Sequence, residues 1–201
     1  MTIRSCRKSS AISRGLSLTL RSEKLYTKKI YFSGGDFHEL QELFSEIPGV
    51  VEVTAGFISA KNVCSYANPE PRELENISGV EVKFNPKKID LSILMDILFG
   101  VLNPYSENNL GVYYASGEDE PQVELHLNFI ANRGKQPLAT NACITVNDTT
   151  LNPKFARKCY AAAGRLKNFV AAPESDQNFL KKNPEAKTDI DFKKLKATLR
   201  F

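Results

Sequence analysis

The chain has 201 residues, of which 42% are hydrophobic and 25% are charged, and its formal net charge is +4. This length is enough for one good hydrophobic core and too short for two large ones. No apolar run approaches the roughly 20 residues that cross a bilayer, so we expect no association with a membrane.

The positive charge is concentrated at the N-terminus. Residues 1–29 contain eight basic residues and a single acid, Glu23, and are rich in serine. This composition is typical of an organelle transit peptide and equally of a disordered arm. We therefore expect residues 1–28 to form a basic arm, and a location that is either cytoplasmic or organellar, in a mitochondrion or plastid. No groove-reading motif accompanies the basic residues, so we expect no nucleic-acid partner.

The residues that commonly bind metals are few. The four cysteines, Cys6, Cys64, Cys143 and Cys159, fit neither a zinc motif nor a CxxC pair. Only two histidines are present, which gives a histidine metal site or a Ser-His-Asp triad little support. The sequence therefore predicts no metal site.

The first elements follow one another closely. A β-prone run over 29–33 ends at a glycine pair, and apolar residues at helical spacing then predict a helix over 37–46. Asp36 precedes this helix as a favoured N-cap residue, with Glu39 three residues later as in a capping box. After a Pro-Gly stop, a Val- and Thr-rich run predicts a strand over 50–57.

The pattern then repeats. A polar stretch over 59–77 predicts a long loop, and alternation over 80–84 predicts a strand. Apolar residues between Ile89 and Leu98 mark a second helix, and a strand is predicted over 111–116. Two strand–helix–strand units predict an α/β (α+β two-layer) fold, with a ferredoxin-like split βαβ core in which helices pack on a mixed sheet.

The later part of the chain is less regular. Residues 123–130 fit a strand or a helix, residues 142–146 fit a strand, and the alanine-rich stretch 155–170 predicts a helix. In the tail, 186–201, apolar residues at helical spacing with lysines between them predict a short helix over 189–201.

Five segments resemble, in order, the signature of the A-type peptide methionine sulfoxide reductases. The matching segments are 31–57, 80–86, 103–104, 111–116 and 169–184. In the first segment, Asp36-Phe37-His38 stands where the family has Cys-Phe-Trp. The resemblance implies that residues 29–185 form the family domain, between the basic arm and the tail.

The resemblance also implies a chemistry. In that family a thiolate at a helix N-terminus, which lowers a thiol's pKa, attacks the sulfoxide sulfur. A glutamate protonates the departing oxygen, two tyrosines and an aspartate hold it, and aromatic side chains hold the methyl group. The sulfenic acid is then resolved by another thiol and thioredoxin. The ligand implied is methionine sulfoxide, free or in peptides, with no bound cofactor, and with thioredoxin or another thiol as reductant. We expect a monomer.

The resemblance assigns positions of this chain to that site. Asp36 occupies the nucleophile position, Phe37 the methyl-binding position, Tyr66 and Tyr114 the two tyrosine positions, and Asn109 that of the aspartate. The acid position falls near Ser78. A carboxylate is a hard, weakly basic nucleophile and has no route to the two-electron reduction of sulfur. We therefore expect a family member that has lost the reductase reaction, or a binder of a methionine sulfoxide-type ligand.

Two alternatives stay open. Cys64 lies two residues before Tyr66, in the loop expected to approach the pocket, and its thiol offers a relocated nucleophile for a working peptide-methionine (S)-S-oxide reductase. The other alternative is a non-catalytic interaction protein that reuses the fold and makes contact through its arm or its tail.

Overall fold

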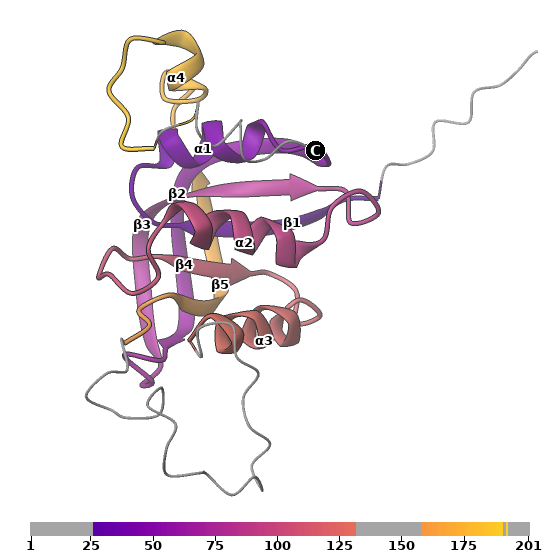
Figure 1. The fold of residues 1–201 in the computed structure, drawn as a ribbon, viewed down its shortest axis with the longest axis vertical. Helices are drawn as coiled ribbons and strands as arrows, with labels where there is room; N and C mark the ends of the chain where they lie inside the picture. The colour runs from indigo at the N-terminus through magenta and orange to yellow at the C-terminus, as the bar shows by residue number, and fades with distance from the viewer. Residues whose placement is uncertain (1–25, 132–157, 191, 193–201) are drawn as a thin grey trace, which may run out of the picture.

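The computed structural model describes residues 26–131, 158–190 and 192 (Figure 1). Five strands and four helices occur in these residues. In chain order they are β1 (Lys28–Ser33), α1 (Phe37–Ser45), β2 (Val50–Ser65), β3 (Arg72–Phe84), α2 (Leu91–Val101), β4 (Gly111–Tyr114), α3 (Glu120–Ala131), β5 (Ala162–Ala171) and α4 (Phe179–Lys182). None of the helices described is long and apolar enough to span a membrane.

The five strands form a single closed sheet in the order β1-β3-β2-β5-β4, and β4 pairs again with β1. The β4–β5 pair is parallel, and the other four pairs are antiparallel. The mixed α/β fold predicted from the sequence is therefore confirmed. The sheet is a closed five-strand barrel and not an open ferredoxin-like sheet, because β5 joins β2 to β4.

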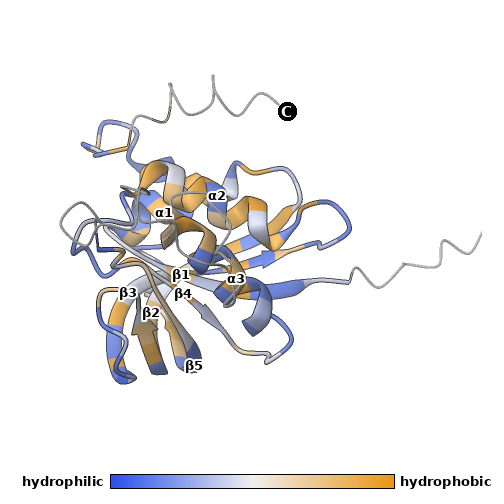
Figure 2. Cartoon of the chain, turned by 60° about the horizontal axis from the view of Figure 1, so that its bottom comes forward, coloured by the Kyte–Doolittle hydropathy of each residue, from blue (hydrophilic) through white to orange (hydrophobic). Residues whose placement is uncertain are grey.

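Side chains at alternate strand positions belong to two different hydrophobic clusters. Phe32, Val80 and Val112 face the helices and pack with residues such as Phe44 of α1 and Leu94 of α2. Figure 2 shows α1 and α2 on the same side of the strands. The neighbouring positions point to the opposite face, inside the closed sheet, where the second cluster consists of Tyr31, Ile58, Ala60, Val63, Tyr113 and Ala162.

The secondary structure predicted for the first half of the chain is confirmed except in one place. The structure has β1, α1, α2 and β4 at their expected positions, but the loop expected over 59–77 is wrong. Instead β2 continues to Ser65 and β3 begins at Arg72, which makes a long hairpin. Asn62 and Asn76 adopt left-handed φ values of 54° and 53°, and the β2–β3 ladder shifts register between Ile58 and Val63. Such irregularities interrupt the alternation that reveals a strand in a sequence.

The helix predicted over 155–170 is also wrong where the structure describes it. Residues Ala162–Ala171 form β5, which pairs with β2 on one side and β4 on the other. Ladders on both sides override the helical preference of alanine. Close packing requires small residues here: a Cβ on Gly164 would lie 2.5 Å from Cγ2 of Val63.

The remaining elements have mixed outcomes. Residues 123–130, which fitted a strand or a helix, belong to α3. The strand predicted over 142–146, the basic arm up to residue 25 and most of the predicted tail helix lie outside the described residues.

Candidate functional site

Asp36 begins α1 as its N-cap, as predicted. Its φ and ψ are −83° and 127°, and its exposed carboxylate accepts a hydrogen bond of 2.9 Å from the backbone nitrogen of His38. The expected capping box does not form, because the buried Glu39 carboxylate instead accepts from the backbone nitrogen of Asp189. The carboxylate at the family's nucleophile position therefore caps the N-terminus of α1.

Aromatic rings surround the start of α1. The Phe37 ring lies 5.9 Å from that of Phe57 on β2, measured between centroids. The His38 ring contacts those of Phe37 and Phe179, with centroids at 4.4 and 4.6 Å, and its Nδ1 is buried without a hydrogen bond to a described residue. Ser78, at the position of the family's acid, has a hydroxyl that donates to the Gly35 carbonyl at 3.3 Å and brings no carboxylate to this place.

Asn109 lies near the same end of the sheet. Its carbonyl accepts a 2.6 Å hydrogen bond from the Ser33 hydroxyl, and its own φ is 51°. The Ser33 hydroxyl is also 3.3 Å from the hydroxyl of Tyr113 inside the sheet. Sequence reasoning missed this buried pair, because no local pattern relates residues 80 positions apart.

A cavity of about 810 Å³ lies at α3, and we call it the α3 cavity. Its wall contains Cys64, Tyr66 and Tyr114, three of the residues singled out from the sequence. The α3 residues that face it are Glu120, Pro121, Glu124, Leu125, Leu127 and Asn128, and Ala161, Ala163 and Arg165 contribute from the chain entering and forming β5. The cavity therefore combines an apolar wall with a thiol, two phenols and three charged groups.

Both phenols stay protonated at neutral pH. Tyr114 is only 5% exposed, and burial, followed by its hydrogen bond to Glu120, raises its pKa. Burial also raises the pKa of Tyr66, with smaller contributions from Cys159, Glu124 and Cys64. Each hydroxyl therefore keeps its hydrogen, and Tyr114 donates its own to the Glu120 carboxylate.

The two described thiols differ in access. Cys64 is exposed, whereas Cys159 is buried and burial raises its pKa, which favours its neutral form. Cys64 is thus the described thiol that a ligand in the α3 cavity can reach.

The structure divides the predicted site into two groups. Asp36, Phe37 and Asn109 lie near the start of α1, while Cys64, Tyr66 and Tyr114 line the α3 cavity. Cys64 is seven residues beyond Phe57 on β2, or roughly 20 Å along an extended strand. Figure 1 likewise shows α1 and α3 toward opposite ends of the molecule.

Sequence reasoning missed the charged residues of the α3 cavity. Glu120 and Glu124 are one helical turn apart, a spacing that places both on one face of a helix. That signal was readable only once 120–131 was known to be helical. Arg165 could not be found, because the segment that contains it was predicted to be a helix.

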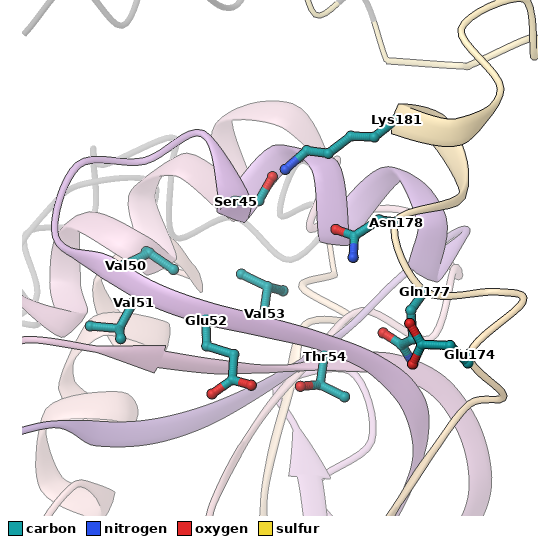
Figure 3. Close-up of a pocket in the computed structure, with 10 residues that line it drawn as sticks. All are labelled: Ser45, Val50, Val51, Glu52, Val53, Thr54, Glu174, Gln177, Asn178 and Lys181. Carbon is teal, nitrogen blue, oxygen red and sulfur yellow. The ribbon is translucent and has the colours of Figure 1, made fainter.

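A second cavity, of about 480 Å³, lies between β2 and the segment leading into α4 (Figure 3). It borders Gln177. This buried amide accepts from the Ala55 nitrogen at 3.0 Å and from Gln41 Nε2 at 2.8 Å, and donates to the carbonyls of Ala55 and Ala172. Gln177 is thus fully engaged in holding the chain after β5 against α1 and β2.

Among the residues described, no group of three or more His, Cys, Asp or Glu could hold a metal ion.

Comparisons with known proteins identify the family. The model of the family "Peptide methionine sulfoxide reductase" matches residues 28–200. Two relatives are the peptide methionine sulfoxide reductases MsrA of Mycoplasma genitalium and Mycoplasma pneumoniae. They are 26% and 27% identical to this chain, over 183 and 173 residues respectively. Each match covers 82% of this chain and 99% of the relative.

Solved structures have the same fold. Reduced Mxr1 from Saccharomyces cerevisiae superposes with a TM-score of 0.56 at 18% identity, covering 85% of this chain and 93% of that one. Methionine sulfoxide reductase A of Corynebacterium diphtheriae gives 0.54 at 18% identity, over 85% and 81% of the two chains. Mxr1 in complex with Trx2 gives 0.51, also at 18% identity, over 81% and 91%. The match over most of its length shows that this chain belongs to the peptide methionine sulfoxide reductase family.

Proposed function

We propose that this protein does not reduce methionine sulfoxide at the start of α1, and that it binds a methionine sulfoxide-type ligand in the α3 cavity. The observation behind the first part is the contact of Asp36: its carboxylate caps the helix through His38, where the family resemblance requires a thiolate. A carboxylate cannot take the sulfoxide oxygen and supply two electrons, so this position lacks the reaction's essential group.

The lining of the α3 cavity supports the second part of the proposal. A sulfoxide oxygen is a strong hydrogen-bond acceptor, and the neutral hydroxyl of Tyr66 is a donor in the cavity wall. The Tyr114 hydroxyl donates its hydrogen to Glu120, so Tyr114 adds its ring to the lining. Leu127 and Ala163 offer apolar contacts to the methyl and methylene groups. Phe37, which the resemblance assigns to the methyl group, lies outside this lining.

A second candidate function is reduction by Cys64, favoured by its place in the same cavity as the two phenols. The Cys64 thiolate would attack the sulfoxide sulfur, and the oxygen would transfer to the thiol as a sulfenic acid while the thioether is released. A dithiol such as dithiothreitol or thioredoxin would return Cys64 to the thiol, forming a disulfide and water. The structure of the relative Mxr1 with Trx2 supports thioredoxin as the partner in that case.

One assay separates the two functions. Reduction of a peptide containing methionine S-sulfoxide is followed with dithiothreitol, and in parallel with thioredoxin, for the natural protein and for Cys64→Ser. We expect no product from either protein. Product from the natural protein that disappears in Cys64→Ser would establish the second candidate. Product that persists in Cys64→Ser and disappears in Asp36→Ala would overturn both.

Two finer features are also proposed. The consecutive order β4-β1-β3-β2 within the barrel, with α1 and α2 in the connections, supports a split βαβ unit that β5 closes. The family match over 28–200 supports a single family domain that follows a separate basic arm.

A further inference from the structure

The charged groups of the α3 cavity come from different elements. Glu120 and Glu124 project from successive turns of α3, and Arg165 comes from β5, where its Cα pairs with that of Tyr114. Within the described chain, none of these three side chains forms an ion pair. Among the residues that the structure describes, the cavity therefore presents carboxylates from its helix and a guanidinium from its strands without a charged partner, and Glu120 accepts a hydrogen bond from Tyr114.

These charges favour a ligand that has both a positive and a negative group. A carboxylate pair beside two tyrosine rings suits an ammonium group, because carboxylates and aromatic faces both attract cations. A guanidinium suits a carboxylate, which it binds through two parallel hydrogen bonds. The apolar residues of the same lining, such as Leu127 and Ala163, suit a short aliphatic side chain.

We propose that the α3 cavity prefers free methionine sulfoxide, or a free amino acid of similar size, over the same residue within a peptide. This inference rests on the proposed function, since it names the ligand class of the same cavity. Arg165 receives the α-carboxylate, while Glu124 receives the α-ammonium group. A residue inside a peptide has neutral amides at both positions, and would leave these charged groups without partners.

A matched ligand pair tests the preference on the unaltered protein. Binding of L-methionine S-sulfoxide is measured by titration calorimetry at pH 7, and compared with its N-acetyl, N-methylamide derivative, which mimics a peptide. We expect the free amino acid to bind at least roughly tenfold more tightly, a difference of about 1.4 kcal/mol in binding free energy, because only the free amino acid forms charge-assisted contacts with these groups.

Variants then assign the preference to the named groups. Arg165→Gln and Glu124→Gln should each reduce the ratio of the two affinities toward one, while leaving the blocked ligand's affinity nearly unchanged. Lys167→Gln is the matched control, because Lys167 is an exposed cation of the same strand that pairs with Glu73 and Glu75 and does not line the cavity. It should leave the ratio as it is.

The outcomes distinguish the inference from the function on which it rests. Equal affinity for the two ligands, or tighter binding of the blocked one, overturns the preference and leaves the proposed ligand site standing. Absence of binding by both ligands overturns the ligand site and the preference together. A tenfold ratio that survives both Arg165→Gln and Glu124→Gln overturns the assignment to these residues.

Discussion

The Phe37 and Phe57 rings lie 5.9 Å apart, centroid to centroid, and join the start of α1 to the middle of β2. Cys64 lies seven residues beyond Phe57 on the same strand, at the wall of the α3 cavity. The aromatic neighbourhood of the family's nucleophile position is thus separate from the exposed thiol. Chemistry or binding at one place should therefore be insensitive to small changes at the other.

Asp36 should matter for stability and not for binding. Asp36→Ala removes the cap on His38 N and should lower the free energy of unfolding by about 1 kcal/mol, measured by urea denaturation. Asp36→Asn should restore most of this loss, since asparagine is also a good N-cap. Affinity for methionine sulfoxide should be the same in all three proteins, and a large drop in Asp36→Ala would place the ligand at α1.

Gln177 should be among the costliest polar side chains to remove. Gln177→Ala leaves the Ala55 N–H and one N–H of the Gln41 amide without an acceptor in a buried place. The Ala55 carbonyl still accepts from the Ala172 nitrogen, and Gln41 still donates to the Val53 carbonyl. We expect a loss of about 2–4 kcal/mol in the free energy of unfolding, measured in urea. Gln122→Ala, which removes a partly exposed amide that bonds Asp90 and Ser92, should cost less than half as much. Equal losses would show that the Gln177 network contributes little.

Glu39 should make stability depend on pH. Burial raises its pKa above the ordinary 4.5, although hydrogen bonds from the backbone of Asp189 and Ile190 lower it in part. The folded protein therefore retains a proton on Glu39 at pH values where the unfolded chain has lost it. The resulting stabilisation is fully present below pH 4.5 and is lost as the pH rises through the folded-state pKa.

Substitution isolates this contribution. Between pH 4 and pH 7, the free energy of unfolding of the natural protein should fall relative to that of Glu39→Gln, whose amide oxygen can still accept from Asp189. Glu42→Gln removes the same charge from the same helix, as the control. A constant difference between the natural protein and Glu39→Gln across this range would contradict the prediction.

Close packing of β2 against β5 gives a fourth prediction. Gly164→Ala introduces a Cβ 2.5 Å from Val63 Cγ2 and 3.1 Å from the Val63 Cα, so the strands must separate. The free energy of unfolding should fall by about 1–3 kcal/mol. Gly117→Ala is the control, because no atom lies within 4 Å of its added carbon. A similar change in melting temperature for both variants would mean that the barrel tolerates a wider β2–β5 spacing.

The fold could be predicted where local patterns are regular. The β1, α1 and α2 segments have clean strand or helix periodicity, and both helices begin at an aspartate that caps them, Asp36 or Asp90. The long β2–β3 hairpin could not be predicted, because left-handed asparagines and register shifts interrupt its alternation. β5 could not be predicted because pairing with two distant strands, and not its own alanine-rich composition, determines its conformation.

The site was predictable only in part, for a related reason. Helix capping by Asp36 depends on neighbours two residues away, and the sequence contains that information. The meeting of Cys64 and Tyr114 with Glu124 depends on β5 closing the barrel beside α3. The resemblance assigned Tyr114 and Asn109 to one pocket, whereas here Tyr114 lines the α3 cavity and Asn109 lies beside Ser33.

The most direct test of the account is a titration of the ¹⁵N-labelled protein with L-methionine S-sulfoxide, followed by amide chemical shifts. We predict shifts concentrated at Cys64, Tyr66, Tyr114 and the α3 residues Glu120 to Leu125, around the α3 cavity. Shifts concentrated instead at Gly35 to His38 and Phe57, around the start of α1, would contradict the account and return the ligand to the family's original position.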